Sequence, residues 1–248
     1  MIRAVLFDYD GVLVDSMPYH VAAWMEVMGR YDVAISPEEI YLEEGSRTEE
    51  VAAELFRRRD RDFSRELLQE IVNAKRDQYL ANNQTMLVDG ALDLLEHLKK
   101  DGYRLGLVTG SIRAQVEGTL GKEIESMFDC VIASEDVEHG KPNPEPFLKA
   151  AQRLNVAAEE CLVIENAPLG VYAARAAGMW VVAVLATLPS HYLREAHQVV
   201  ADLIELRQRL PQVLAVPDHV PQQLHVPQQL HKTEHHVNVI TDNELEYE

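Results

Sequence analysis

The chain has 248 residues, 47% of them hydrophobic, so it can bury a sizeable core and form one large domain with a smaller second unit. Its formal net charge of −18 argues against nucleic acid and anionic membrane surfaces as partners. A site for a phosphate ester would have to offset this negative electrostatic field with a metal ion and a few cationic side chains. The sequence has no apolar run of about 18 residues and begins like a buried strand, so we expect a cytoplasmic protein.

Short apolar runs of strand length recur along the chain and are typical of parallel strands that are covered on both faces. They lie at residues 4–7, 104–108, 130–133, 162–164 and 180–184. Helical patterns lie between most of them, at residues 91–100, 114–120, 144–154 and 170–177. This alternation predicts an α/β fold built on a doubly wound parallel sheet.

A long stretch of helical character separates the first predicted strand from the second, and it is much longer than a crossover connection requires. Within it, Ser36 opens a capping box with proline at the first helical position, and Ser64 begins a second helical pattern. We therefore expect an all-helical cap at residues 17–83, inserted into a core formed by residues 1–16 and 84–215.

The last part of the chain, residues 216–248, differs in composition from the rest. The hexapeptide Val-Pro-Gln-Gln-Leu-His occurs twice in succession, and five of the ten histidines lie in this segment. Its density of proline excludes a continuous helix. The segment is predicted to be a flexible tail, with a metal-binding or partner-binding segment as the alternative.

Two aspartates, Asp8 and Asp10, directly follow the first predicted strand and precede a glycine. Doubly wound sheets bind ligands at the carboxyl ends of their strands, and alternate strand residues point to the same side. Two carboxylates held close together need a nearby cation or a shared proton. Aspartates that only cap the next helix are the alternative, but a cap does not require the pair.

Four motifs in order resemble those of the haloacid dehalogenase superfamily over residues 1 to about 210. The first is Asp8-Tyr-Asp-Gly-Val-Leu-Val-Asp-Ser16, and the second strand ends in Leu107-Val-Thr-Gly-Ser111. The third motif contains Lys141 in Gly-Lys-Pro-Asn-Pro, and the fourth contains Glu165-Asn166. The resemblance implies the Rossmann-like core of that superfamily and an enzyme that transfers phosphoryl groups.

The resemblance also implies a role for each motif. Asp8 would be the nucleophile that forms an aspartyl phosphate, and Asp10 would be the general acid and base. Lys141 would keep Asp8 ionised. The phosphoryl oxygens would be held at a helix N-terminus by Thr109, Gly110 and Ser111.

Magnesium is the cofactor that the resemblance implies, because the ligands are few, hard oxygen atoms. These would come from Asp8, from the backbone carbonyl of Asp10 and from the side chains of Glu165 and Asn166. Many relatives carry a second acid at the position of Asn166. The amide supplies one negative charge fewer, so we expect weaker metal binding or a larger contribution from Glu165.

The cap contributes His20 and Arg47, in segments similar to the subgroup that contains β-phosphoglucomutase and phosphoglycolate phosphatase. Both are expected to contact the substrate, although His20 could instead pack within its helix. Mutases of this subgroup usually carry a lysine where this chain has Glu43. Because an acid would repel a second phosphate, the sequence favours a phosphatase over a mutase.

The sequence thus predicts a magnesium-dependent phosphatase that hydrolyses a small phosphorylated metabolite, for example a sugar phosphate. A phosphosugar isomerase of the β-phosphoglucomutase kind is the second hypothesis. A catalytically silent binding protein with the same fold is the third, but it would be marked by loss of Asp8 or Lys141, and both are present. The oligomeric state is left open.

Overall fold

A computed structural model describes residues 1–215, and the predicted tail at 216–248 lies outside the described residues. Residues 1–215 form a six-stranded parallel sheet with the strand order β3-β2-β1-β4-β5-β6. The strands are β1 (Ala4–Phe7), β2 (Arg104–Val108), β3 (Cys130–Ile132), β4 (Cys161–Glu165), β5 (Trp180–Val184) and β6 (Gln198–Val200). The predicted α/β fold with a doubly wound sheet is confirmed.

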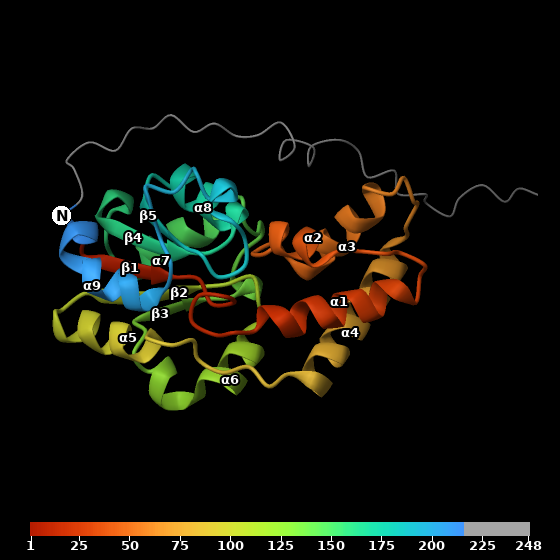
Figure 1. The fold of residues 1–248 in the computed structure, drawn as a ribbon, viewed down its shortest axis with the longest axis horizontal. Coiled ribbons are helices and arrows are strands. Elements are labelled where there is room, and N and C mark those ends of the chain that lie inside the picture. The colour runs from red at the N-terminus through yellow and green to blue at the C-terminus, as the bar shows by residue number, and fades with distance from the viewer. Residues whose placement is uncertain (216–248) are drawn as a thin grey trace, which may run out of the picture.

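Helices cover both faces of this sheet (Figure 1). Strand β1 illustrates the two layers, since Val5 and Phe7 pack into one apolar cluster and Ala4 and Leu6 into another. The first cluster includes side chains of α5 (Ala91–Lys100), α6 (Arg113–Glu125) and α9 (Leu203–Leu214). The second includes side chains of α7 (Glu145–Leu154) and α8 (Pro168–Ala176). Short 3₁₀ turns occupy Ser134–Asp136, Ala158–Glu160 and Ser190–Tyr192.

The first four of the five helices between β1 and β2 form a separate body beside the sheet, which we call the cap (Figure 1). They are α1 (Met17–Gly29), α2 (Pro37–Leu42), α3 (Thr48–Arg57) and α4 (Arg65–Asn82). The cap packs around an apolar cluster of its own, which includes Trp24, Phe56 and Ile71. The capping box at Ser36 is present, and the Ser64 hydroxyl accepts a hydrogen bond from the Leu67 amide at the start of α4.

Two details differ from the sequence-based prediction. Strand β6, which pairs with β5, was not predicted because it has only three residues and only Val200 among them is buried. The helix predicted at 114–120 is followed by a further turn that extends to Glu125, beyond a break at Gly121, where φ is 70°. Within residues 1–215, no helix is long and apolar enough to cross a membrane.

Candidate active site

The candidate site lies where the carboxyl ends of β1, β2 and β4 meet. The strand order reverses between β1 and β4, and sheets of this kind bind ligands at such a switch point. Asp8 follows β1, Thr109 follows β2, and Glu165 is the last residue of β4. The topology therefore brings together motifs that lie far apart in the sequence.

Buried polar side chains gather at this point. The polar and charged residues that are buried within residues 1–215 are Asp8, Asp10, Ser16, His20, Glu44, Lys75, Thr109, Lys141, Glu165 and Asn166. All of them line one of two neighbouring pockets at the switch point or contact a residue that does. Burying several charges is costly even when they are paired, so such a cluster points to function more than to stability.

Lys141 joins two of the acids. Its Nζ atom lies 2.5 Å from Asp8 Oδ1, 2.6 Å from Glu165 Oε1 and 3.2 Å from the Val108 carbonyl oxygen. Burial lowers the pKa of Lys141, but the charges of Asp8 and Glu165 outweigh it and raise the pKa above its usual range. Burial and the nearby carboxylates raise the pKa of Asp8, and Lys141 opposes this shift. The single charge of Lys141 thus does not neutralise both Asp8 and Glu165.

Asp10 accepts three hydrogen bonds from side chains. Ser16 Oγ lies 2.5 Å and His20 Nε2 lies 3.1 Å from Oδ1, and Ser111 Oγ lies 2.7 Å from Oδ2. Burial raises the pKa of Asp10, but His20 and these hydrogen bonds together lower it to about 2. Asp10 is therefore held as a carboxylate, which is the form that can accept a proton.

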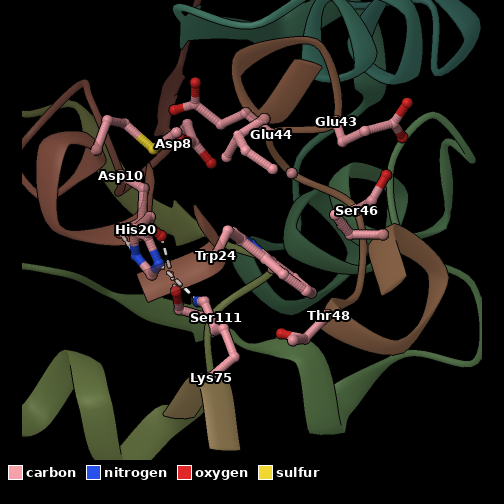
Figure 2. A pocket seen from close by; sticks show the side chains of 15 residues that line it. Asp8, Asp10, His20, Trp24, Glu43, Glu44, Ser46, Thr48, Lys75 and Ser111 are labelled. Carbon is pink, nitrogen blue, oxygen red and sulfur yellow. Dashed lines mark hydrogen bonds and ion pairs between the residues drawn. The ribbon is translucent and has the colours of Figure 1, made fainter. Parts of the chain in front are cut away.

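His20 contacts Asp10 on one side and Lys75 on the other (Figure 2). Lys75 Nζ lies 2.7 Å from His20 Nδ1, and burial lowers the pKa of Lys75 to about 8. An ammonium donating to Nδ1 and Nε2 donating to Asp10 define a neutral imidazole, in line with the lowered pKa of His20, whose main cause is burial. The ring also stacks on Tyr79, with centroids 4.2 Å apart.

Lys75 was missed by the sequence analysis, although a signal for it exists. The buried residues of α4 are Leu68, Ile71, Lys75 and Tyr79, which lie three or four residues apart on one helix face. A lysine on the apolar stripe of an amphipathic helix is unusual, because an unpaired buried ammonium is costly. That position could have been selected as a candidate site residue.

The loop after β2 contains Thr109, Gly110 and Ser111, the residues predicted to bind phosphate. The Ser111 amide donates to Thr109 Oγ1 over 2.9 Å, and Gly110 and Ser111 both line the main pocket. A Cβ atom added to Gly110 would lie 2.9 Å from the Gly45 carbonyl oxygen, which is closer than real contacts allow. The absence of a side chain at Gly110 therefore lets the cap loop approach the loop after β2.

The cap loop at residues 43–47 lies directly on the core. Ser46 Oγ donates to the Lys141 carbonyl oxygen over 3.4 Å, and Arg47 Nη1 donates to the Glu138 carbonyl oxygen over 3.1 Å. Arg47, predicted to contact the substrate, lines a smaller neighbouring pocket with Thr109 and Lys141. Glu43 lines the main pocket and forms an ion pair with Arg58.

Residues Glu165 and Asn166 differ in which atoms are free to bind a ligand. Glu165 Oε1 accepts from Lys141, and Oε2 accepts from the amides of Asn166 and Ala167 over 2.8 and 2.9 Å. Asn166 Nδ2 donates to Glu44 Oε1 over 2.7 Å, whereas its Oδ1 is buried and lacks a hydrogen-bond partner within residues 1–215. The oxygen that is free to bind a ligand is thus the amide oxygen of Asn166.

The carboxylate and amide oxygen atoms gathered at the switch point are of the kind that binds a hard cation. Within residues 1–215, no three His, Cys, Asp or Glu side chains are arranged to hold a metal ion by themselves. Magnesium does not require such a group, because it is usually bound through one or two carboxylates, with water and substrate phosphate completing its shell. The unpartnered Asn166 oxygen and the surplus of buried acids are what such an ion would satisfy.

Known proteins are similar to this chain in sequence and in fold. The family model described as haloacid dehalogenase-like hydrolase matches residues 5–184. Fructose-1-phosphate phosphatase YqaB of Escherichia coli (strain K12) is 35% identical over 181 residues, covering 71% of this chain and 92% of that protein. Beta-phosphoglucomutase of Bacillus subtilis (strain 168) is 31% identical over 189 residues, covering 73% and 83%. The crystal structure of beta-phosphoglucomutase from Clostridium difficile has a TM-score of 0.77 at 27% identity and covers 86% and 97%.

The Rossmann-like sheet carries Asp8 and Asp10 at its switch point, as the resemblance to the haloacid dehalogenase superfamily implies. The family match agrees with this class of enzyme. The chain belongs to the haloacid dehalogenase-like hydrolase family. The resemblance drawn from the four sequence motifs is confirmed.

Proposed function

We propose that this enzyme is a magnesium-dependent phosphatase that hydrolyses a small phosphomonoester, such as a sugar phosphate, through an aspartyl phosphate on Asp8. One observation carries the proposal: the carboxylate of Asp8 is held by Lys141 at the switch point, with Asp10 lining the same pocket. A nucleophile and a proton-transfer group side by side are the elements that two-step transfer needs. The phosphatase prediction made from the sequence agrees with relatives that are named as phosphatases.

The proposed reaction has two steps. In the first, an Asp8 oxygen forms a bond to phosphorus, the ester bond breaks, and Asp10 gives a proton to the departing alkoxide. In the second, Asp10 takes a proton from a water molecule whose oxygen attacks phosphorus. The bond between phosphorus and the Asp8 oxygen breaks, so phosphate is released and the Asp8 carboxylate is regenerated. Because Asp10 must be protonated for the first step, the negative charge of the arriving phosphate has to raise its low pKa.

The residues around the reacting atoms have supporting roles in this proposal. Thr109, Gly110 and Ser111 hold the phosphoryl oxygens, and Lys141 balances the charge of Asp8. His20 and Lys75 orient Asp10 from the cap side, so His20 acts through Asp10. The proposed cap, residues 17–83, covers the site and excludes bulk water.

The proposed magnesium ion would be held by Asp8, by the backbone carbonyl of Asp10 and by Asn166 Oδ1. When bound, it would neutralise negative charge on the phosphoryl oxygens. Glu165, expected from the sequence to be a ligand, instead has both oxygens engaged by Lys141 and backbone amides. We therefore assign Glu165 to positioning Lys141.

Removal of divalent ions is expected to reduce phosphatase activity to background. The proposed site has surplus buried acids that repel a phosphate dianion unless a cation is present. The measurement is phosphate release after treatment with EDTA and after addition of excess Mg²⁺. Recovery with Mg²⁺ supports the cofactor, whereas full activity in EDTA would contradict it.

The choice between phosphatase and mutase cannot rest on Glu43 alone. Arg58 pairs with Glu43, so the repulsion that the sequence analysis expected for a second phosphate is weakened. The phosphatase assignment is supported instead by relatives such as fructose-1-phosphate phosphatase YqaB and hexitol phosphatase A of Escherichia coli. The similarity to beta-phosphoglucomutase of Bacillus subtilis keeps phosphosugar isomerisation as the second candidate.

One assay separates these two functions. We expect free phosphate to appear faster than isomerised sugar phosphate when the enzyme is given a panel of sugar and polyol phosphates with Mg²⁺. β-Glucose 1-phosphate belongs in the panel, because a mutase would convert it to glucose 6-phosphate. If isomerisation exceeds hydrolysis by about tenfold or more, a difference of about 1.4 kcal/mol in barrier height, the mutase function replaces the phosphatase.

A further inference from the structure

Glu44 of the cap reaches across to Asn166 of the core. Glu44 is only 7% exposed, and its Oε1 accepts a hydrogen bond of 2.7 Å from Asn166 Nδ2. Its second oxygen lies 3.5 Å from Thr187 Oγ1, in the segment after β5. A cap carboxylate is thus buried against the core residue whose oxygen is proposed to bind the cation.

The other amide atom of Asn166 has no partner. Asn166 is fully buried, and its Oδ1 has no hydrogen-bond partner among the described residues. Figure 2 shows Glu44 extending into the pocket beside Asp8. A buried oxygen without a partner and two neighbouring carboxylates form an arrangement that a cation would stabilise.

The buried charges of the site also point to a divalent ion. Among residues 1–215, the buried acids are Asp8, Asp10, Glu44 and Glu165, whereas the buried lysine and arginine side chains are Lys75 and Lys141. With all four carboxylates ionised, both lysines charged and His20 neutral, the cluster would carry an excess of two negative charges, which one divalent cation would cancel. Without Glu44 the excess would be one, so Glu44 supplies half of the charge that such an ion would neutralise.

We propose that Glu44 completes the divalent-cation site by supplying, from the cap, the carboxylate charge that the neutral side chain of Asn166 does not supply. This inference rests on the proposed magnesium-dependent function. It makes cation binding depend on the position of the cap, since Glu44 reaches Asn166 only when the loop at 43–47 lies on the core. It goes beyond that function by assigning part of the metal site to a cap residue.

The test is calorimetric titration of the full-length, substrate-free protein with Mg²⁺, so it does not depend on turnover. The variants are Glu44→Gln and the double variant Glu44→Gln/Asn166→Asp. The double variant exchanges the amide and the carboxylate across one hydrogen bond and keeps the total charge. Glu43→Gln is the matched control, because Glu43 is the adjacent acid but is paired with Arg58.

We expect Glu44→Gln to weaken Mg²⁺ binding at least about tenfold and the double variant to recover most of that loss. The control should bind Mg²⁺ within about twofold of the parent. Melting curves in EDTA verify that each variant is folded. A double variant that is folded keeps the test informative if Glu44→Gln alone does not fold.

Other results would overturn the inference. Unchanged or tighter binding by Glu44→Gln would mean that Glu44 competes with the ion for Asn166 or serves only the substrate. A loss that the double variant does not recover would mean that Glu44 acts through the shape of the cap loop and not through its charge. A parent protein that binds no Mg²⁺ would refute the proposed metal site itself, which is a different failure.

Discussion

Replacing Asp8 with asparagine is expected to abolish phosphatase turnover while the fold persists. The amide has the same size as the carboxylate, but it cannot attack phosphorus, so the aspartyl phosphate cannot form. Lys141 keeps Glu165 as a partner at 2.6 Å, and the variant has one buried negative charge fewer. We therefore expect the melting temperature in EDTA to be unchanged or higher, because like charges in the site repel one another less.

The measurements are phosphate release and thermal unfolding, each compared with Asp62→Asn. Asp62 is an exposed cap residue, so the same chemical change there should leave both quantities at parent values. Activity of Asp8→Asn within tenfold of the parent would remove Asp8 from the role of nucleophile. A variant that is inactive because it is unfolded would be recognised from its melting curve.

Replacing Asp10 with asparagine is expected to lower kcat by about 10²–10⁴-fold, the usual contribution of a general acid and base. The introduced amide would still accept hydrogen bonds from Ser16 and His20 through its oxygen, so the local geometry should be retained. The amide cannot transfer a proton to the alkoxide or take one from water. Both steps should therefore be slowed.

The leaving group distinguishes this role from a structural one. p-Nitrophenolate departs without a proton, so the first step of Asp10→Asn should be much less impaired with p-nitrophenyl phosphate than with an alkyl phosphate. Rapid mixing should then show a burst of p-nitrophenolate followed by slow turnover, because the second step still needs the base. Equal impairment of the first step with both substrates would contradict general acid catalysis by Asp10.

The core of the fold was predictable because local patterns determine it. Five continuous apolar runs became β1 to β5 within one or two residues. Strand β6 was not predictable, since three residues with one buried side chain give no periodic signal. Pairing with β5, a tertiary contact, makes this segment a strand.

The candidate site was predictable only where residues belong to motifs. Asp8, Asp10 and Lys141 were identified in this way and meet at the switch point. The contacts of Lys75 and Glu44 could not be derived, because they depend on how the cap lies against the core. His20 was predicted to contact the substrate or to pack within its helix. It lines the main pocket, and no sequence pattern indicated that its ring lies between Asp10 and Lys75, a partner 55 residues away.

The most direct test of the proposed chemistry is to look for the phosphorylated aspartate. Asp10→Asn should accumulate it, because hydrolysis of the intermediate needs the base that this variant lacks. The variant is mixed with Mg²⁺ and p-nitrophenyl phosphate, quenched in acid, and its peptides are analysed by mass spectrometry. We predict one phosphoryl group on Asp8, which is absent in Asp8→Asn/Asp10→Asn. Turnover in which Asp8 remains unmodified, or a phosphoryl group on another residue, would contradict the aspartyl-phosphate route.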